Sequence, residues 1–305
     1  MKVNLMHSDG NRKIDIFEWE KPDINDNQIE VKTAYCGICR SDIGAFNDWE
    51  KPMPLGMFGH EGIGTVSKVG SNITDVKVGD YVATWSDPAY AEYYNANSNQ
   101  FVKIPELHPK YIMQPTACAI NIFNHTMEFA KFMGYEKEEF LLIGTGFMSI
   151  VIAQLFNNVI TIGKSNKHFL TKFGATSYDD FVDLPKEKYK VIIDLSSKAS
   201  NFNIINKIAD IEALICYAAT PFTPITTNFF ENCWNCHTFI MPSPRNLNFN
   251  SSMKMGVDLI LENKLNTDVL WTKEYKAFDL ESMYEGFNDG THRTPEYLRG
   301  YFKFE

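Results

Sequence analysis

Residues 36–42 read Cys-Gly-Ile-Cys-Arg-Ser-Asp, and residues 59–62 read Gly-His-Glu-Gly. Cys39, His60 and Glu61 offer a thiolate, an imidazole and a carboxylate, which are the ligand types that zinc favours in proteins. The glycines in both segments allow the backbone to approach a metal closely. Because the three ligands lie in separate segments, only tertiary structure can bring them together. The two segments therefore predict a zinc centre that depends on the fold around it.

Strands dominate the sequence on either side of these segments, from residue 1 to about residue 105. Residues 29–35 and 64–70 alternate in polarity or carry β-branched side chains between turn signals. Residues 77–82 place a Gly-Asp turn before another strand. The first third of the chain is therefore expected to form a β-rich domain.

The pattern changes from about residue 112 onward, where strands alternate with helices. We expect helices over 116–133, 147–157 and 167–173, and buried strands over 140–143, 159–163, 191–194 and 213–217. This alternation predicts an α/β protein with a parallel, doubly wound sheet. The tail, residues 251–305, is expected to begin as a helix and to return to the first domain.

Four segments resemble one known family at corresponding places and in the same order. They read CGICRSDIGAFNDW (36–49), GHEGIG (59–64), KVGDY (77–81) and YAEY (90–93). The chain is identified by them as a member of the zinc-dependent medium-chain dehydrogenase/reductases, the alcohol dehydrogenase superfamily. The resemblance implies a GroES-like β-rich catalytic domain (1–118 and 265–305) and a Rossmann nucleotide-binding domain (119–264).

The same resemblance implies roles for the residues of the two opening segments. Cys39 and His60 match two zinc ligands, and Glu61 matches the carboxylate that lies beside the metal or exchanges onto it. Asp42 matches the acid that orients the ligating histidine. Ser41 matches the hydroxyl that binds the substrate oxygen and passes its proton. Ser41, Asp42 and Glu61 are thus the expected catalytic groups.

The expected third zinc ligand is where this sequence departs from the family. The family places Cys, Asp or Glu before the linking helix, but Gln114 stands there, and an amide oxygen is a weaker donor. Three outcomes follow: Glu61 completes the shell, Cys118 swings in, or zinc affinity is low. We favour Glu61, because Cys118 matches a position that packs against the nicotinamide ring. Gly44 also stands where the family has a relay histidine.

The structural zinc lobe of the family, which needs four cysteines after the Gly-Asp turn, is missing from the sequence. Residues 83–93 run directly from a strand to Tyr-Ala-Glu-Tyr. We therefore expect one catalytic zinc ion and no structural zinc.

A glycine-rich turn marks the expected cofactor site. The segment Gly144-Thr145-Gly146-Phe147-Met148-Ser149 follows a short apolar strand and opens a helix. This context lets a pyrophosphate rest on the helix N-terminus. We expect the pyrophosphate site to be lined by Gly144, Gly146, Phe147 and Met148. The family resemblance implies that Arg40 contacts a cofactor phosphate.

The end of the next strand bears on the choice of cofactor. Gly163-Lys164-Ser165 carries no acid of the kind that accepts hydrogen bonds from the ribose of NAD. Lys164 and Ser165 can instead bind a 2′-phosphate. The alternative is a solvated basic turn. We favour NADP(H) over NAD(H), with Gly163 allowing close approach.

The segment Cys233-Trp234-Asn235-Cys236-His237 fits a haem-attachment pattern. No export signal accompanies it, and a zinc knuckle would need more ligands nearby. Packing near a subunit interface is favoured for this segment. Phe229, Phe230 and Trp234 are expected in the core or in that interface.

The composition excludes several other classes of protein. The 305 residues carry a net charge of −9, and no lysine-arginine run suggests a nucleic-acid or anionic-membrane partner. No apolar segment reaches the ~18 to 20 residues of a membrane helix, and the start lacks a signal peptide. Six cysteines do not suggest a disulfide scaffold. We expect a cytoplasmic homodimer or homotetramer with reduced thiols, acting on a small alcohol or carbonyl compound.

Three functions remain open from the sequence. The first is a zinc-dependent, NADP(H)-linked alcohol dehydrogenase or carbonyl reductase. The second is a zinc-free NADPH reductase of activated C=C or C=N bonds, which Gln114 and Gly44 favour. The third is a catalytically inactive nucleotide-binding protein, against which the intact Cys39, His60 and Glu61 argue.

Overall fold

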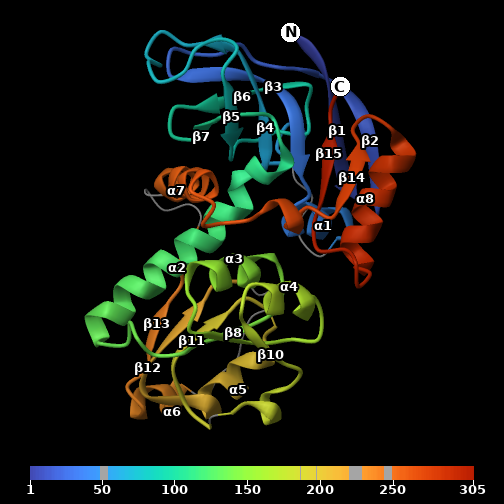
Figure 1. Cartoon of the computed structure of the whole chain (residues 1–305). Helices are drawn as coiled ribbons and strands as arrows, with labels where there is room; N and C mark the ends of the chain where they lie inside the picture. The colour runs from blue at the N-terminus through green and yellow to red at the C-terminus, as the bar shows by residue number, and fades with distance from the viewer. Residues whose placement is uncertain (49–53, 186, 197, 220–228, 244–248) are drawn as a thin grey trace. The chain divides into compact units, whose positions relative to one another are not determined.

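The computed structural model describes residues 1–48, 54–185, 187–196, 198–219, 229–243 and 249–305. Contacts between Cα atoms divide the chain into two compact units. Residues 1–117 and 250–305 form the first unit, and residues 118–249 form the second (Figure 1). The boundary at residue 117 falls inside helix α2 (Met113–Met133), so this helix belongs to both units.

The first unit is built on a sheet that has seven strands within the described residues. Its order is β14-β15-β3-β4-β5-β7, and β6 also pairs with β3. Strands β1 and β2 form a separate antiparallel hairpin. The strands are β1 (Lys2–Gly10), β2 (Lys13–Glu20), β3 (Gln28–Gly37), β4 (Gly62–Val69), β5 (Tyr81–Thr84), β6 (Tyr93–Asn97), β7 (Phe101–Ile104), β14 (Lys273–Lys276) and β15 (Gly300–Lys303).

Short helices complete the first unit. They are α1 (Arg40–Phe46), η1 (Pro109–Tyr111), α7 (Phe249–Leu261), η3 (Asp268–Leu270) and α8 (Leu280–His292). The tail therefore contributes α7, α8 and two strands to the unit that also holds the N-terminal residues. Because β15 pairs with β3, the C-terminal segment lies directly beside the strand that leads to Cys39.

An aromatic cluster fills the core of the first unit. Phe287 of α8 is fully buried, and its ring meets those of Phe46, Phe58, Tyr90 and Phe302 at centroid distances between 5.1 and 6.3 Å. Such rings bury large apolar surfaces and interlock in specific orientations. The cluster therefore fixes the position of Tyr90, whose hydroxyl reaches the functional site.

The second unit is an α/β layer structure whose described strands form a six-stranded parallel sheet. Its order is β10-β9-β8-β11-β12-β13, so the chain winds outward twice from β8 and β11. This is the 3-2-1-4-5-6 order of dinucleotide-binding sheets. The strands are β8 (Phe140–Ile143), β9 (Val159–Ile162), β10 (Thr176–Tyr178), β11 (Tyr189–Asp194), β12 (Ala209–Tyr217) and β13 (Thr238–Ile240).

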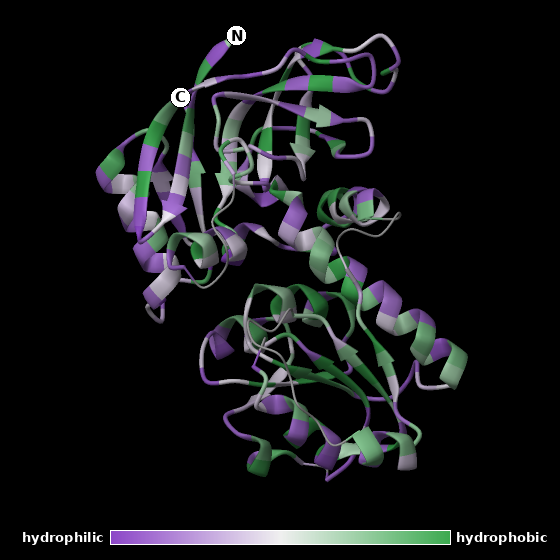
Figure 2. Ribbon diagram, turned by 180° about the vertical axis from the view of Figure 1, so that it is seen from behind, coloured by the Kyte–Doolittle hydropathy of each residue, from purple (hydrophilic) through white to green (hydrophobic). Residues whose placement is uncertain are grey.

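Helices cover both faces of this parallel sheet. In Figure 1, α3 (Phe147–Leu155) and α4 (Lys167–Lys172) lie on one face, and α5 (Asn201–Ile208) and α6 (Phe229–Trp234) lie on the other; η2 spans Phe181–Asp183. Strands covered on both faces are largely apolar, as the green stretches of the strands in Figure 2 show. All four residues of β8 are buried, and so are those of β9.

The expected parallel, doubly wound sheet is confirmed, and the local patterns that predicted it coincide with the observed elements. The strand expected at 140–143 is β8, and the helix expected at 116–133 begins three residues earlier, at Met113. Among the helices that the structure describes, none is both long and apolar enough to cross a membrane.

Replacing Phe287 tests the aromatic core. We expect Phe287→Ala to lower the free energy of unfolding by about 3–5 kcal/mol, because it removes a large buried ring and leaves a cavity. Urea denaturation followed by circular dichroism measures this change. Phe132→Ala is the control, since that ring is 88% exposed and its loss should cost less than about 0.5 kcal/mol. Equal effects of the two substitutions would contradict the assignment of Phe287 to the core.

Candidate metal centre and cofactor site

Cys39 lies at the junction between β3 and α1, where it caps the helix. Its backbone is extended (φ −77°, ψ 153°), and its carbonyl accepts the first helical hydrogen bond, from Ile43 N at 3.1 Å. The neighbouring Gly37 donates to the Glu61 carbonyl at 3.1 Å, and Ile38 donates to the Gly300 carbonyl at 3.0 Å. These bonds tie the cysteine to the segment that carries the other candidate ligands.

His60 and Glu61 stand just before β4, in a segment whose shape depends on Gly59. Gly59 has φ +81°, and a Cβ there would lie 2.4 Å from the Tyr90 ring. Only glycine combines this left-handed backbone with such close packing. The Tyr90 ring thus lies flat against the backbone that presents His60. Glu61 is fully buried, whereas the His60 side chain is 20% exposed.

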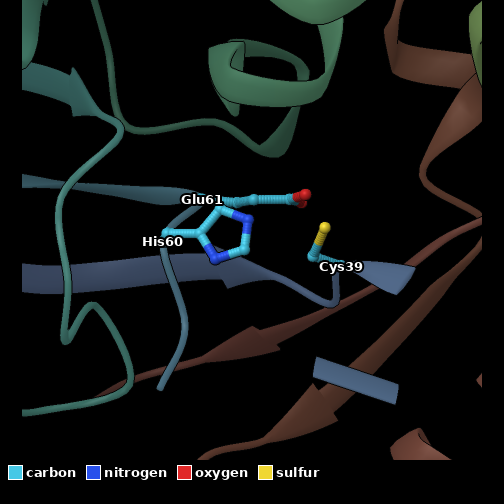
Figure 3. A group of neighbouring side chains, drawn as sticks. All are labelled: Cys39, His60 and Glu61. Carbon is cyan, nitrogen blue, oxygen red and sulfur yellow. The ribbon is translucent and has the colours of Figure 1, made fainter. Parts of the chain in front are cut away.

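Cys39, His60 and Glu61 converge in the first unit. One ligand atom from each lies within 4.8 Å of the other two, and these residues are the only such group of three within the described part of the chain. Figure 3 shows the three side chains pointing toward one another. Residues from two separate segments therefore meet in an arrangement that could hold a metal ion.

Asp42 connects the parts of this cluster. Its buried carboxylate accepts a hydrogen bond from the Cys39 backbone N–H at 3.1 Å through Oδ2. The Tyr90 hydroxyl lies 3.1 Å from the same oxygen and 3.0 Å from the Gly37 carbonyl oxygen. The other carboxylate oxygen, Oδ1, lies 3.8 Å from His60 Nδ1. One buried acid therefore holds the cysteine loop and faces the histidine.

The orientation of His60 follows from the charges around its ring. Asp42 and Asp87 both face Nδ1, at 3.8 and 3.9 Å, and Nε2 points toward the other two ligands (Figure 3). Burial alone would lower the pKa of His60, but its interactions with Cys39, Asp42 and Glu61 raise it well above its usual range. The centre therefore attracts positive charge.

Arg299, near the end of the chain, was not found by sequence reasoning. Its guanidinium forms an ion pair with Glu61 Oε1 and lies 5.5 Å from the Trp271 ring. Burial would lower the pKa of Arg299, but Glu61 and Cys39 outweigh it and raise the pKa, so the side chain is charged. The two residues are 238 positions apart, and no local motif indicates their contact.

The residues of the cluster fit a bound metal ion. Glu61 Oε2 and Asp42 Oδ1 are buried acceptor atoms without a hydrogen-bond partner, a costly state for carboxylate oxygens. A thiolate, an imidazole and a carboxylate with a fourth position open form a donor set of the kind seen in catalytic zinc sites. A cation near Glu61 Oε2 would satisfy that oxygen while Arg299 keeps the other.

The remaining residues predicted for this site lie on two helices. Arg40 and Ser41 form the first turn of α1, with Arg40 exposed and Ser41 partly buried. Gln114 is buried as the second residue of α2, and Cys118 follows four residues later, at the start of the second unit. The roles of these four residues remain predictions.

The glycine-rich turn of the second unit has the backbone expected of a phosphate-binding loop. Gly144 has φ +122° and follows β8 directly, and Gly146 is the N-cap of α3. Apart from its chain neighbours, no described residue would lie within 4 Å of a Cβ at Gly146, so the space beside this glycine is open. Ser149, the departure from the last glycine of the motif, is buried and donates to the Gly144 carbonyl at 2.7 Å. The turn also lies at the carboxyl end of β8, beside the point where the strand order reverses.

The end of β9 lies against this turn. A Cβ at Gly163 would lie 2.4 Å from Thr145 Oγ1, and the Ser165 hydroxyl lies 3.5 Å from that atom. Lys164 is exposed and forms no ion pair with any described residue. Lys167, in contrast, pairs with Asp179 at 2.7 Å. Lys164 is therefore the lysine available to an anion here.

Comparison with known proteins relates both units to dehydrogenases. A family model described as the alcohol dehydrogenase GroES-like domain matches residues 25–106. An alcohol dehydrogenase of Geobacillus stearothermophilus is 28% identical over 62% of this chain and 69% of its own length. An alcohol dehydrogenase of Moraxella is 30% identical over 39% of this chain. That match covers 44% of the relative, less than half of its length.

Solved structures share the whole fold at low sequence identity. TarJ of Staphylococcus aureus in complex with NADPH has a TM-score of 0.81 at 17% identity, and both chains are covered fully. RspB of Escherichia coli, an alcohol dehydrogenase complexed with NADH, has a TM-score of 0.83 at 18% identity over 99% of both chains. These likenesses show the fold, and neighbours with either cofactor share it.

The Tyr90 hydroxyl offers a direct test of how the cluster is held. We expect Tyr90→Phe to weaken zinc binding by about 10- to 100-fold. The substitution removes the hydrogen bond from the Tyr90 hydroxyl to Asp42, the carboxylate that orients His60. Competition with a chromophoric chelator measures the affinity.

Tyr94→Phe is the matched control for this test. Its hydroxyl is equally buried but lies 2.6 Å from Thr84 Oγ1 rather than near Asp42. Its zinc affinity should stay within about threefold of the wild type, and an equal loss in both variants would show a general packing effect instead.

Proposed function

Because the chain belongs to the medium-chain, zinc-type alcohol dehydrogenase superfamily, we propose that it is a zinc-dependent, NADP(H)-linked oxidoreductase. It interconverts a small alcohol and the corresponding aldehyde or ketone by hydride transfer. The observation that carries the proposal is the convergence of Cys39, His60 and Glu61 within 4.8 Å. A protein that had lost this chemistry would have no need of three buried or half-buried metal ligands.

Cys39, His60 and Glu61 would hold the zinc ion, with Glu61 in place of the ligand that Gln114 does not supply well. The ion would supply Lewis acidity that polarises the substrate carbonyl oxygen. Glu61 suits this role because Oε1 is engaged by Arg299 while Oε2 is left without a hydrogen-bond partner. The ion pair with Arg299 thus holds the Glu61 carboxylate in place and leaves Oε2 for the cluster.

The surrounding residues of the chain orient these ligands and handle the proton. Asp42 faces His60 Nδ1 and leaves Nε2 for the metal, and Tyr90 holds Asp42 in place. Burial, together with the neighbouring Asp42, raises the pKa of Tyr90 well above its usual range, so its hydroxyl stays neutral and donates. A bound nicotinamide would supply the hydride, and the Ser41 hydroxyl would give its proton to the substrate oxygen. With Gly44 in the relay position, water returns a proton to Ser41.

The cofactor assignment rests on the second unit. The open N-terminus of α3, at Gly146, suits a pyrophosphate. The exposed Lys164 and Ser165, at the carboxyl end of the neighbouring β9, suit the 2′-phosphate of NADP(H). No carboxylate replaces them at this strand end to bind the ribose of NAD(H) instead.

Metal content and turnover together test the proposed reaction. We expect purified protein to carry one zinc ion per chain and to oxidise NADPH with aldehydes. Cys39→Ser should lose the zinc and at least about a hundredfold in kcat/KM, since Lewis-acid catalysis contributes several kcal/mol. Cys233→Ser, an exchange at an exposed cysteine of the other unit, should change neither quantity. Metal-free protein that reduces enones equally well with and without Cys39 would establish the zinc-free reductase instead.

A charge reversal at Lys164 tests the cofactor preference. We expect Lys164→Asp to raise the Kd of NADPH by about 10- to 100-fold, the value of a charge-assisted contact of roughly 1.5–3 kcal/mol. The Kd of NADH should change by less than about threefold. Nucleotide fluorescence titrations measure both. Lys172→Asp is the control, because it makes the same charge change at the exposed end of α4. Equal losses of affinity for NADPH and NADH in Lys164→Asp would refute the assignment.

A further inference from the structure

Two exposed cysteines stand at the end of helix α6, in a turn that holds them close together. Cys233 lies in the last turn of the helix, and Cys236 lies two residues beyond its end. Cys236 N–H donates to the Cys233 carbonyl at 3.2 Å, and His237 N–H donates to the Asn232 carbonyl at 3.0 Å. This pair of bonds is the Schellman motif that closes many helices. The first bond keeps the two Cα atoms less than about 7 Å apart, within reach of disulfide geometry.

The backbone of Cys236 is unusual for a residue with a side chain. Its φ is +56°, in the left-handed region, at the position of the motif that glycine normally fills. A residue with a Cβ adopts this conformation at a cost in free energy. Because the Cys236 side chain is exposed, its packing offsets little of that cost. The structure thus holds a thiol where the backbone favours a residue without one, which points to a role for the sulfur itself.

A preformed metal site does not explain the pair. The three-ligand group of the described residues is the Cys39 cluster, so Cys233, Cys236 and His237 do not bring three ligand atoms together. The His237 ring is instead held by Asn232, whose Oδ1 lies 3.0 Å from Nδ1. The aromatic neighbours do not bury the pair either: Phe229, Phe230 and Trp234 are 62%, 69% and 77% exposed. Of the two places expected for these rings, the core of the domain does not hold them, because α6 turns them outward; a subunit interface remains a prediction.

We propose that Cys233 and Cys236 form a reversible dithiol–disulfide site that reacts with low-molecular-weight disulfides. One cysteine thiolate attacks a sulfur of the small disulfide, the S–S bond breaks, and a small thiol leaves with a proton. The second cysteine thiolate then attacks the protein sulfur of this mixed disulfide and releases the second small thiol. The protein dithiol loses two electrons and two protons, and the small disulfide gains both.

The place of this site in the sheet separates it from the expected cofactor turn. Asn235, between the two cysteines, accepts a hydrogen bond from Glu212 N early in β12, and Cys236 precedes the start of β13. The pair therefore lies at the amino ends of the parallel strands. The Gly144 turn follows the carboxyl end of β8, at the opposite edge. Oxidation of the pair should leave NADPH affinity within about twofold of the reduced protein.

Thiol mapping of the full chain tests the proposal. The protein is incubated with excess oxidised glutathione and then unfolded in denaturant in the presence of an alkylating agent, which blocks every free thiol. Peptide mass spectrometry then identifies the state of each cysteine. We expect Cys233 and Cys236 to escape alkylation and to lose two hydrogen atoms as a linked pair, and dithiothreitol to restore both thiols. Cys216 is buried, so it should remain a thiol and become alkylated.

Single substitutions distinguish a resolving pair from two independent thiols. In Cys236→Ser the remaining Cys233 should accumulate a stable glutathione adduct, because no second thiol displaces it. Cys236→Gly should show the same adduct and also a higher Tm than Cys236→Ser, because glycine relieves the left-handed strain. The proposal is overturned if the wild-type protein accumulates the same adduct without the internal disulfide. It is also overturned if the glycine variant gains no stability, since the strain argument would then be wrong.

Discussion

The buried carboxylate of Asp42 is the constraint on which the functional unit depends. It is completely removed from solvent, yet it accepts hydrogen bonds from the Cys39 backbone and the Tyr90 hydroxyl and faces His60. A buried charge is tolerated only where such partners surround it. The end of β3, the loop before β4 and the aromatic cluster around Tyr90 are therefore held to one geometry. This arrangement sets the positions of the candidate metal ligands Cys39, His60 and Glu61.

Charge is balanced around the cluster by residues that lie far apart in sequence. Glu61 has one oxygen in an ion pair with Arg299, the residue just before β15, and the other without a hydrogen-bond partner. The N-terminal residues and the C-terminal tail must both be in place before this pair forms, because β15 adds to the sheet beside β3. The Arg299–Glu61 ion pair therefore depends on the pairing of both ends of the chain within the first unit. The proposal that Glu61 takes the place of the ligand missing at Gln114 rests on Glu61 being held in this way.

Local sequence pattern predicted what local forces determine. The apolar run of β8, the glycine-rich turn at Gly144 and the start of α3 form one continuous segment, and the sequence predicted each of them. The motif around Cys39 and His60 likewise predicted residues that the structure brings together. Arg299 and the hydroxyl of Tyr90 could not be foreseen, because their partners lie in other segments and only folding pairs them. For Phe229 and Trp234 the sequence left the core and an interface open, because an apolar side chain does not reveal which side of a helix will be covered.

The composition of the metal shell is the most direct test of this account. X-ray absorption at the zinc edge of the purified protein counts the sulfur ligands. We predict one sulfur, from Cys39, at about 2.3 Å, with the remaining ligands nitrogen or oxygen at about 2.0–2.2 Å. Two sulfur ligands would show that Cys118 rather than Glu61 completes the shell, and protein purified without stoichiometric zinc would contradict the proposed zinc-dependent reaction.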